Sequence, residues 1–230
     1  MSTSASKLLV ANWKSNHSIA SCKEWFDSFE MKQRRSEVVI APPFTLLDTV
    51  RDELDCHKLS CKIAVQNFSK FGYGASTGEI CAENLRGLDV KYAILGHSER
   101  RTKMRETNDI VASKITLALE ANITPIVCLD EDYIDSQAKL MGDATYSKCV
   151  YAYEPLSAIS TTPGAKDPHV KKVIETVIKI KKTFGNVRVI YGGSVTEKNI
   201  IKYIQVCDGI LVGGASLNGT QFSAVVAAAG

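Results

Sequence analysis

Eight short apolar runs divide the sequence at regular intervals, and this pattern leaves few folds open to the chain. Each run is rich in Val, Ile and Leu and is nearly continuous rather than alternating, which is typical of strands buried on both faces of a parallel sheet. The runs cover residues 8–14, 37–43, 62–68, 92–97, 124–130, 149–155, 187–193 and 209–215. Amphipathic segments separate most of them, so the 230-residue chain is predicted to fold as a (β/α)8 barrel.

The clearest predicted helix covers residues 169–185, where an apolar stripe ends at Gly185, a common helix terminator. Other helical patterns occupy 21–35, 43–55, 79–88, 106–122, 196–206 and 218–229. Thr196 is a possible cap for the segment that it opens. These segments alternate with the apolar runs, as the barrel prediction requires.

A doubly wound open sheet is the main alternative fold. It usually has about five or six strands and often a glycine-rich turn after the first. Here the first run continues as ANWKSNHS, which contains no glycine, and we therefore expect a single barrel domain over residues 1–230. The segment between Asp130 and Cys149 is polar and has room for one short helix, so the helix after the fifth strand is predicted to be shortened or missing.

The composition limits the classes of function. With 45% hydrophobic and 23% charged residues the chain resembles ordinary globular proteins, and a net charge of +3 predicts neither a nucleic-acid nor a membrane partner. The N-terminal segment does not resemble a signal peptide. The seven cysteines are dispersed and form no CxxC pair, which favours reduced thiols and a cytoplasmic location. No histidine pair has metal-ligand spacing, and no metal or other cofactor is expected.

Glycine pairs follow the last two predicted strands. Gly192 and Gly193 precede Ser194 after the seventh run, and Gly213 and Gly214 end the eighth. Consecutive glycines leave backbone N–H groups open to a ligand, and barrels of this type often bind phosphate after strands 7 and 8. Two tight turns are the structural alternative, but two pairs at adjacent strand ends favour a phosphate site.

Polar residues end three other strands, at the edge where barrel enzymes have their active sites. Asn12 and Lys14 alternate after the first run, so both side chains can face the barrel mouth. His97 follows the fourth run at the start of a possible short helix, where a neutral imidazole can donate a hydrogen bond to a developing oxyanion. Glu154 ends the sixth run and is placed as a general base. The set predicts proton transfer next to a carbonyl in a small phosphorylated substrate.

The motifs at these strand ends resemble those of the triosephosphate isomerase family, in the family's order and over nearly the whole chain. They are ANWK (11–14), QN (66–67), TGE (77–79), LGHSERR (95–101), ETN (106–108), AYEP (152–155), YGGSV (191–195) and LVGGASL (211–217). The resemblance implies a TIM barrel without a cofactor. It also implies interconversion of dihydroxyacetone phosphate and D-glyceraldehyde 3-phosphate through an enediolate.

The resemblance assigns a role to each matching residue. It implies that Glu154 is the base, that His97 is the electrophile, that Asn12 and Lys14 bind the oxyanion and phosphate, and that Glu99 positions the lysine. Implied phosphate contacts are Ser160, Ser194, Gly213 and Gly214. Implied supporting residues are Tyr191, as a partner of the closed lid, and Ile159 with Leu211, as an apolar pair against the base. Arg100 and Glu106 match a structural ion pair.

Members of this family are usually dimers, in which the loop after strand 3 reaches into the partner. The matching loop covers residues 67–79 here, with Thr77 at the tip that contacts the neighbour. A loop of this length would be an unusual exposed finger in a monomer, so we expect a homodimer.

The segment that matches the family's lid, residues 155–163, departs from the family pattern. Ser157 replaces a tryptophan, Ser160 and Thr162 replace glycines, and Pro163 replaces a lysine. Since proline fixes φ and lacks an N–H, we expect an active isomerase with altered lid closure. Two alternatives stay open: another phosphosugar barrel, such as an aldolase, and a binding or structural homologue with weak or lost activity.

Overall fold

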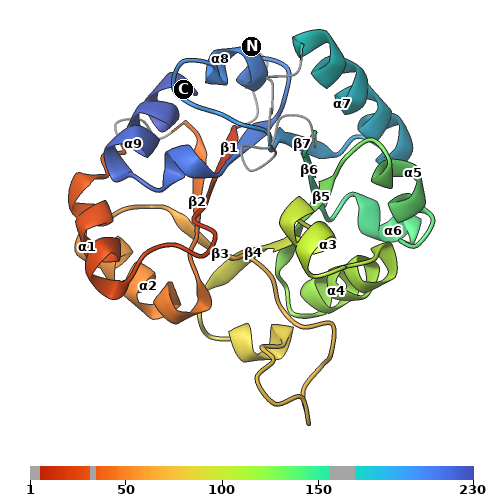
Figure 1. Ribbon diagram of the computed structural model, residues 1–230, viewed down its shortest axis with the longest axis horizontal. Helices are drawn as coiled ribbons and strands as arrows, with labels where there is room; N and C mark the ends of the chain where they lie inside the picture. Colours follow the sequence, from red (N-terminus) through yellow and green to blue (C-terminus); the bar gives the residue numbers. More distant parts are fainter. Residues whose placement is uncertain (1–5, 32–34, 156–168) are drawn as a thin grey trace.

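The eight apolar runs form the strands of a closed parallel barrel in a computed structural model of the chain, which describes residues 6–31, 35–155 and 169–230 (Figure 1). The strands are β1 (Leu8–Asn12), β2 (Glu37–Ala41), β3 (Lys62–Val65), β4 (Val90–Leu95), β5 (Thr124–Leu129), β6 (Val150–Tyr153), β7 (Arg188–Tyr191) and β8 (Gly209–Val212). Each strand pairs with the next in sequence, and β8 pairs with β1 to close the ring. The predicted barrel fold is confirmed.

Both faces of the strands are buried, which explains the continuous apolar runs. In β1, Leu8 and Val10 belong to the core inside the barrel, whereas Leu9 and Ala11 belong to the core between the strands and the surrounding helices. The same alternation continues around the ring, so neither face of a strand has a solvated row that would require polar residues.

Helices surround the barrel (Figure 1). They are α1 (Ile19–Ser28), α2 (Leu47–Cys56), α3 (Ser98–Lys103), α4 (Asn108–Glu120), α5 (Tyr133–Ala138), α6 (Asp143–Tyr146), α7 (Val170–Phe184), α8 (Ile200–Ile204) and α9 (Gly219–Ala228). Gly185 follows α7 with a φ of 87°, as predicted for a terminating glycine. Within the described ranges, no helix is both long and apolar enough to cross a membrane.

Two local predictions are wrong. The segment 79–88 is not an α-helix but contains a short 3₁₀ helix, Ala82–Leu85, because the backbone is extended on both sides of it, at Cys81 and at Arg86. The residue at the N-cap of α8 is Asn199 rather than Thr196. Thr196 instead caps the preceding turn: its Oγ1 accepts the Lys198 N–H at 3.3 Å, and its backbone N–H donates to Asn199 Oδ1 at 2.8 Å.

The connection between β5 and β6 is short, as predicted, but it holds two short helices rather than one. Ile134 and Ala138 bury the inner face of α5 against α4 and α7. Tyr146 at the end of α6 meets Phe184 of α7 edge-on, with ring centroids 5.0 Å apart. These contacts fill the space between α4 and α7 that a long helix would otherwise occupy.

Candidate active site

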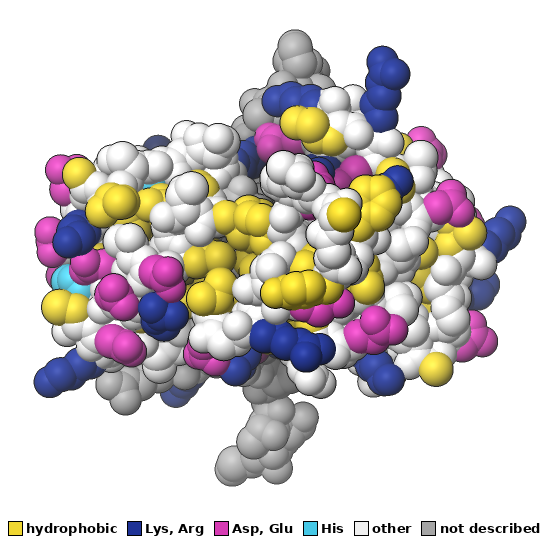
Figure 2. All heavy atoms as spheres, turned by 90° about the horizontal axis from the view of Figure 1, so that it is seen from below, with side chains coloured by type: hydrophobic (Ala, Val, Ile, Leu, Met, Phe, Trp, Pro, Cys, Tyr) yellow, Lys and Arg dark blue, Asp and Glu magenta, His cyan; other side chains and the backbone are white. Residues whose placement is uncertain are grey.

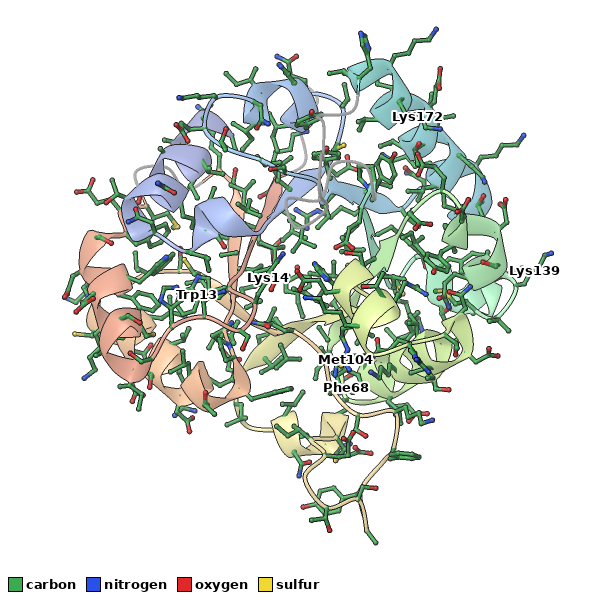
Figure 3. The ribbon with its side chains drawn as sticks, in the orientation of Figure 1. Trp13, Lys14, Phe68, Met104, Lys139 and Lys172 are labelled. Atoms are coloured by element: carbon green, nitrogen blue, oxygen red, sulfur yellow. The ribbon has the colours of Figure 1, made fainter. Side chains whose placement is uncertain are left out.

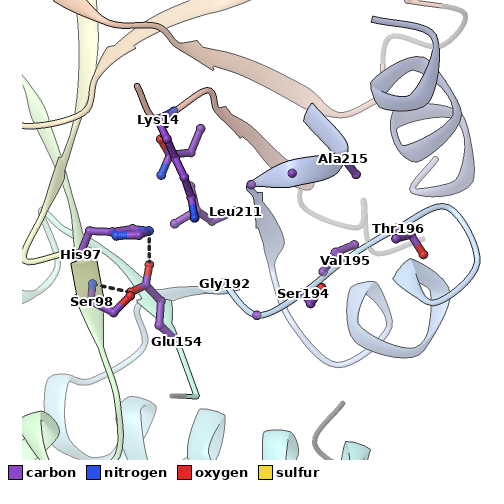
Figure 4. A pocket seen from close by; sticks show the side chains of 14 residues that line it. Lys14, His97, Ser98, Glu154, Gly192, Ser194, Val195, Thr196, Leu211 and Ala215 are labelled. Carbon is purple, nitrogen blue, oxygen red and sulfur yellow. Dashed lines mark hydrogen bonds and ion pairs between the residues drawn. The ribbon is translucent and has the colours of Figure 1, made fainter. Parts of the chain in front are cut away.

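The carboxyl ends of β1, β4, β6, β7 and β8 converge on one pocket, which Figure 4 shows from close by. Eight of the site residues predicted from the sequence line it: Asn12, Lys14, His97, Glu154, Ser194, Leu211, Gly213 and Gly214. They meet because all eight strands run in the same direction, so residues that follow the strands share one end of the barrel. Ile159 and Ser160 lie outside the described residues.

Glu154 follows β6 and is only 3% exposed. Its Oε2 accepts the backbone N–H of Ser98 at 2.9 Å, and its Oε1 lies 3.3 Å from Nε2 of His97 (Figure 4). The thiol of Cys128 in β5 lies close to this carboxylate. Burial, and then the neighbouring charge of Glu154, raises the pKa of Cys128 well above its ordinary value, so the thiol stays protonated beside the acid.

His97 occupies the N-cap position of α3, and its ring orientation follows from that place. The backbone N–H of Glu99 donates to Nδ1 at 3.2 Å. Because Nδ1 accepts this hydrogen bond, the hydrogen of the neutral ring is on Nε2, the atom that faces Glu154. The helix terminus thus presents a donor to the pocket.

Lys14 extends into the centre of the barrel mouth (Figure 3). Its Nζ lies 2.7 Å from Oε1 of Glu99, and its backbone adopts a left-handed φ of 52°, which costs about 1 kcal/mol for a residue with a Cβ. Hydrogen bonds from its N–H to Asn12 Oδ1 (3.1 Å) and from Gln66 to its C=O (2.8 Å) hold that conformation. Burial alone would raise the pKa of Glu99, but the hydrogen bond and the charge of Lys14 outweigh it and lower that pKa from its ordinary value.

The opposite edge of the pocket, after β7 and β8, combines four glycines with small side chains (Figure 4). A Cβ on Gly192 would lie 2.9 Å from Cγ of Glu154, and one on Gly213 would lie 3.4 Å from Cε of Lys14. A Cβ on Gly214 would meet nothing within 4 Å. Position 192 therefore requires a glycine, because the side chain of Glu154 occupies the space that a Cβ would need. The sequence alone did not reveal this reason.

The remaining predicted residues surround this pocket or lie away from it. Tyr191 is fully buried below the glycine edge and stacks on Tyr203 with ring centroids 4.1 Å apart. Thr77 is exposed on the loop between β3 and β4 and lines a different groove. The predicted ion pair of Arg100 with Glu106 is present at 2.6 Å.

Two functional neighbours were missed by reasoning from the sequence. The Ser98 amide holds Glu154, and the Arg101 side chain lies buried behind the pocket. Both belong to the GHSERR motif, whose predicted short helix is confirmed as α3. A backbone donor has no signal in a sequence, whereas a second arginine after the histidine was visible there.

No metal-binding arrangement is present among the residues that the structure describes: no group of three or more His, Cys, Asp or Glu side chains is placed to hold an ion. All seven cysteines lie in the described ranges and are free thiols.

Comparison with known proteins assigns the family. A sequence model of the family described as triosephosphate isomerase matches residues 7–229. The triosephosphate isomerase of Shewanella loihica is 34% identical over 244 aligned positions, which cover 94% of each chain. Those of Shewanella amazonensis and Shewanella woodyi have the same identity and coverage. The chain therefore belongs to the triosephosphate isomerase family.

Proposed function

We propose that this chain interconverts dihydroxyacetone phosphate and D-glyceraldehyde 3-phosphate by proton transfer through an enediolate. The observation that carries the proposal is the meeting of Glu154 and His97, 3.3 Å apart, on one side of a pocket whose other side is formed by glycines and Lys14. A base, a hydrogen-bond donor, a fixed cation and an open anion-binding edge are what this isomerisation needs.

The phosphate of the substrate binds at the glycine edge. Ser194, Gly213 and Gly214 line the pocket there and can offer backbone N–H groups, and Lys14 supplies the positive charge. Since Gly214 has open space where a Cβ would lie, a phosphate oxygen can approach the backbone closely.

The proton then moves at the other edge. Glu154 leaves the Ser98 amide and removes a proton from the carbon next to the carbonyl, and the C–H electrons form the C=C bond of the enediolate. His97 donates from Nε2 to the oxygen that gains charge, with Asn12 and Lys14 as further donors. The hydroxyl proton on the carbon that lost the C–H passes by way of His97 Nε2 to the former carbonyl oxygen. Return of the proton from Glu154 to the former carbonyl carbon then completes the isomerisation with no net change in protons.

Leu211 supports the base in this scheme. It is 3% exposed, belongs to the core inside the barrel and lines the pocket (Figure 4). An apolar side chain at this position limits the access of water to the carboxylate. The family resemblance also implies that Ile159 packs against the base together with Leu211, and this role of Ile159 stays a prediction.

A coupled assay tests the function. The purified chain is mixed with D-glyceraldehyde 3-phosphate, and dihydroxyacetone phosphate is followed by NADH consumption through a reductase that uses it. We expect turnover far above the uncatalysed rate, and a folded protein without activity would reject the proposal. Methylglyoxal is measured in the same samples, because the expected change in lid closure predicts more of this by-product. Methylglyoxal formation equal to that of an ordinary family member would contradict the proposed change in lid closure.

We also propose that the chain acts as a homodimer. The loop between β3 and β4 extends away from the barrel (Figure 1) and carries Phe71 and Tyr73, which are 52% and 78% exposed. Apolar side chains gather on the face from which this loop projects (Figure 2). The nearby Met104 is 61% exposed and lines two grooves beside the loop, one of which also contains Lys14.

A second copy of the chain fits these features, because its own loop offers the same apolar side chains and its Thr77 tip to the groove next to Lys14. Sedimentation at micromolar concentration is expected to give the mass of a dimer, and a monomer mass would contradict the proposal. The cytoplasmic location expected from the sequence stays a prediction.

A further inference from the structure

Arg101 is a buried cation that the scheme above does not use. It lies on α3, a helix of six residues, and is 8% exposed. Its guanidinium donates to the Gly96 carbonyl at 2.7 Å, to Asn108 Oδ1 at 2.7 Å and to Gln137 Oε1 at 3.2 Å. Burial of a charge among neutral partners costs free energy, so this arrangement calls for a reason beyond packing.

The partners of Arg101 come from four different segments. Gly96 precedes α3, Asn108 begins α4 and Gln137 lies on α5. The carbonyl of Cys128 in β5 accepts a longer bond of 3.4 Å, and the guanidinium lies over the ring of Tyr133, 4.1 Å from its centroid. One side chain therefore joins the active-site helix to the short β5–β6 connection.

The turn before α3 is shaped around this guanidinium. Gly96 has a left-handed φ of 69°, and a Cβ there would lie 2.8 Å from Nη2 of Arg101 and 2.9 Å from Val111. The space that a side chain would need at this position is taken up by the arginine. The chain thus enters α3 along a path that depends on Arg101.

That path decides where two groups of the active site lie. Ser98 is the first residue of α3, and its N–H donates to Glu154; His97 is the N-cap residue. Since Ser98 and Arg101 are three residues apart, they lie on the same side of the helix. A shift of Arg101 would therefore move the donor that holds the base and the imidazole beside it.

We propose that Arg101 is a positioning residue for the base: it ties the first turn of α3 to α4, β5 and α5 and so sets where the Ser98 amide and the His97 imidazole meet Glu154. This inference rests on the proposed role of Glu154. Arg101 touches no substrate in this scheme, and its effect passes through the helix.

Three variants test the inference, with one matched control. Arg101→Met is expected to lower kcat about a hundredfold, because a displacement on the order of 1 Å costs that much in a positioned reaction. Arg101→Lys should lower kcat about tenfold, and Gln137→Ala about threefold, since each variant keeps part of the hydrogen bonding that joins α3 to the neighbouring segments. The control Lys139→Met removes a positive charge from the same short connection, but Lys139 is exposed and points outward (Figure 3), so kcat should not change.

The glycine edge provides an internal reference. No bond of Arg101 reaches it, so KM and the inhibition constant of inorganic phosphate are expected to stay within about twofold in all variants. A loosening of the whole barrel mouth would instead weaken phosphate inhibition together with kcat.

Arg101→Lys separates position from charge. The titratable groups around Arg101 are Cys128 of β5, Asp130 after it, Tyr133 of α5 and Glu154 after β6. A lysine keeps the positive charge among these groups but not the fork of guanidinium donors. A fall in kcat with unchanged phosphate inhibition in Arg101→Lys is therefore due to position rather than charge.

Two results would overturn the inference: a folded Arg101→Met enzyme with kcat within threefold of the parent, or parallel losses in kcat and phosphate inhibition. If Arg101→Met does not fold, the same comparison in Arg101→Lys and Gln137→Ala decides. Glu154→Gln is measured alongside, because an active Glu154→Gln enzyme would reject the role of the base itself rather than the role of Arg101.

Discussion

The two edges of the active-site pocket are built in opposite ways. The edge formed after β4 and β6 consists of side chains, and each has fixed partners: Glu154 is held by the Ser98 amide, and His97 by the Glu99 amide. The edge formed after β7 and β8 contains two pairs of glycines, and a Cβ on Gly214 would meet no atom within 4 Å. The first edge thus provides functional side chains, whereas the glycines of the second edge leave space beside the backbone.

This difference separates chemistry from binding in the proposed mechanism. Loss of a functional group from the side-chain edge should lower kcat, because the group acts on the reacting carbon. Addition of atoms to the glycine edge should raise KM, because the atoms fill the place of the phosphate. The four predictions below test this division, from the largest expected effect to the smallest.

Replacement of the base should have the largest effect. Glu154→Gln keeps the size of the side chain but removes its ability to take a proton, so we expect kcat to fall about a thousandfold with little change in KM. Steady-state kinetics in both directions measure this. A kcat within tenfold of the parent value would show that the side-chain edge is not where the proton moves.

Gly192→Ala tests the one glycine that belongs to both edges. Its Cβ would lie 2.9 Å from Cγ of Glu154 and 3.3 Å from the Tyr153 carbonyl, so the base has to shift. We expect kcat to fall about thirtyfold while KM changes less than threefold, unlike the result for other glycines of this edge. If KM rose instead and kcat stayed constant, Gly192 would serve binding alone.

Gly213→Ala should act on binding. The added methyl would meet the end of the Lys14 side chain at 3.4 Å and occupy the phosphate side of the pocket. We expect KM and the inhibition constant of inorganic phosphate to rise about tenfold, with kcat nearly unchanged. The matched variant Ala215→Gly removes a methyl from the same pocket wall and should leave phosphate inhibition unchanged. A fall in kcat without a change in phosphate inhibition would contradict the division.

Glu37→Gln tests a polar cluster at the opposite end of the barrel, where we expect stability without function. Burial alone would raise the pKa of Glu37, but hydrogen bonds from Lys62, Tyr92 and Arg188 outweigh it and lower that pKa from its ordinary value. Removal of the charge should lower the free energy of unfolding by about 1–2 kcal/mol at pH 7 and leave kcat unchanged.

The loss of stability in Glu37→Gln should depend on pH, and the direction of this dependence follows from the lowered pKa of Glu37. A carboxylate with a lowered pKa stabilises the fold above its unfolded pKa, and this contribution disappears as the pH falls through the folded pKa. The difference in stability between the parent and Glu37→Gln should therefore be full at neutral pH and shrink as the pH falls from the ordinary range of a glutamate through its lowered folded pKa. A difference that does not vary with pH, measured by urea unfolding, would show that packing rather than charge is responsible.

The strands and most of the pocket could be predicted from the sequence. Parallel strands buried on both faces leave long apolar runs, and the carboxyl ends of these strands meet at one rim. A histidine or glutamate directly after such a run, such as His97 or Glu154, is therefore placed by the fold itself.

The missed features depend on contacts between segments. The reason for a glycine at position 192 is the side chain of Glu154, which comes from another strand. The hydrogen bonds of Arg101 reach three other segments, of which α5 is too short and too polar to be recognised by periodicity. The helix predicted at 79–88 is wrong for a local reason, because Cys81 and Arg86 have extended backbone that a periodic pattern does not reveal.

The fate of the transferred hydrogen tests the central claim most directly. The parent enzyme is allowed to convert D-glyceraldehyde 3-phosphate in D₂O, and the product is examined by proton NMR. If Glu154 removes a proton and returns one to the neighbouring carbon, the base can exchange with solvent, and dihydroxyacetone phosphate should carry deuterium at C1 in a substantial fraction of molecules. Rapid turnover with no deuterium on carbon would contradict transfer through a base that exchanges its proton with solvent.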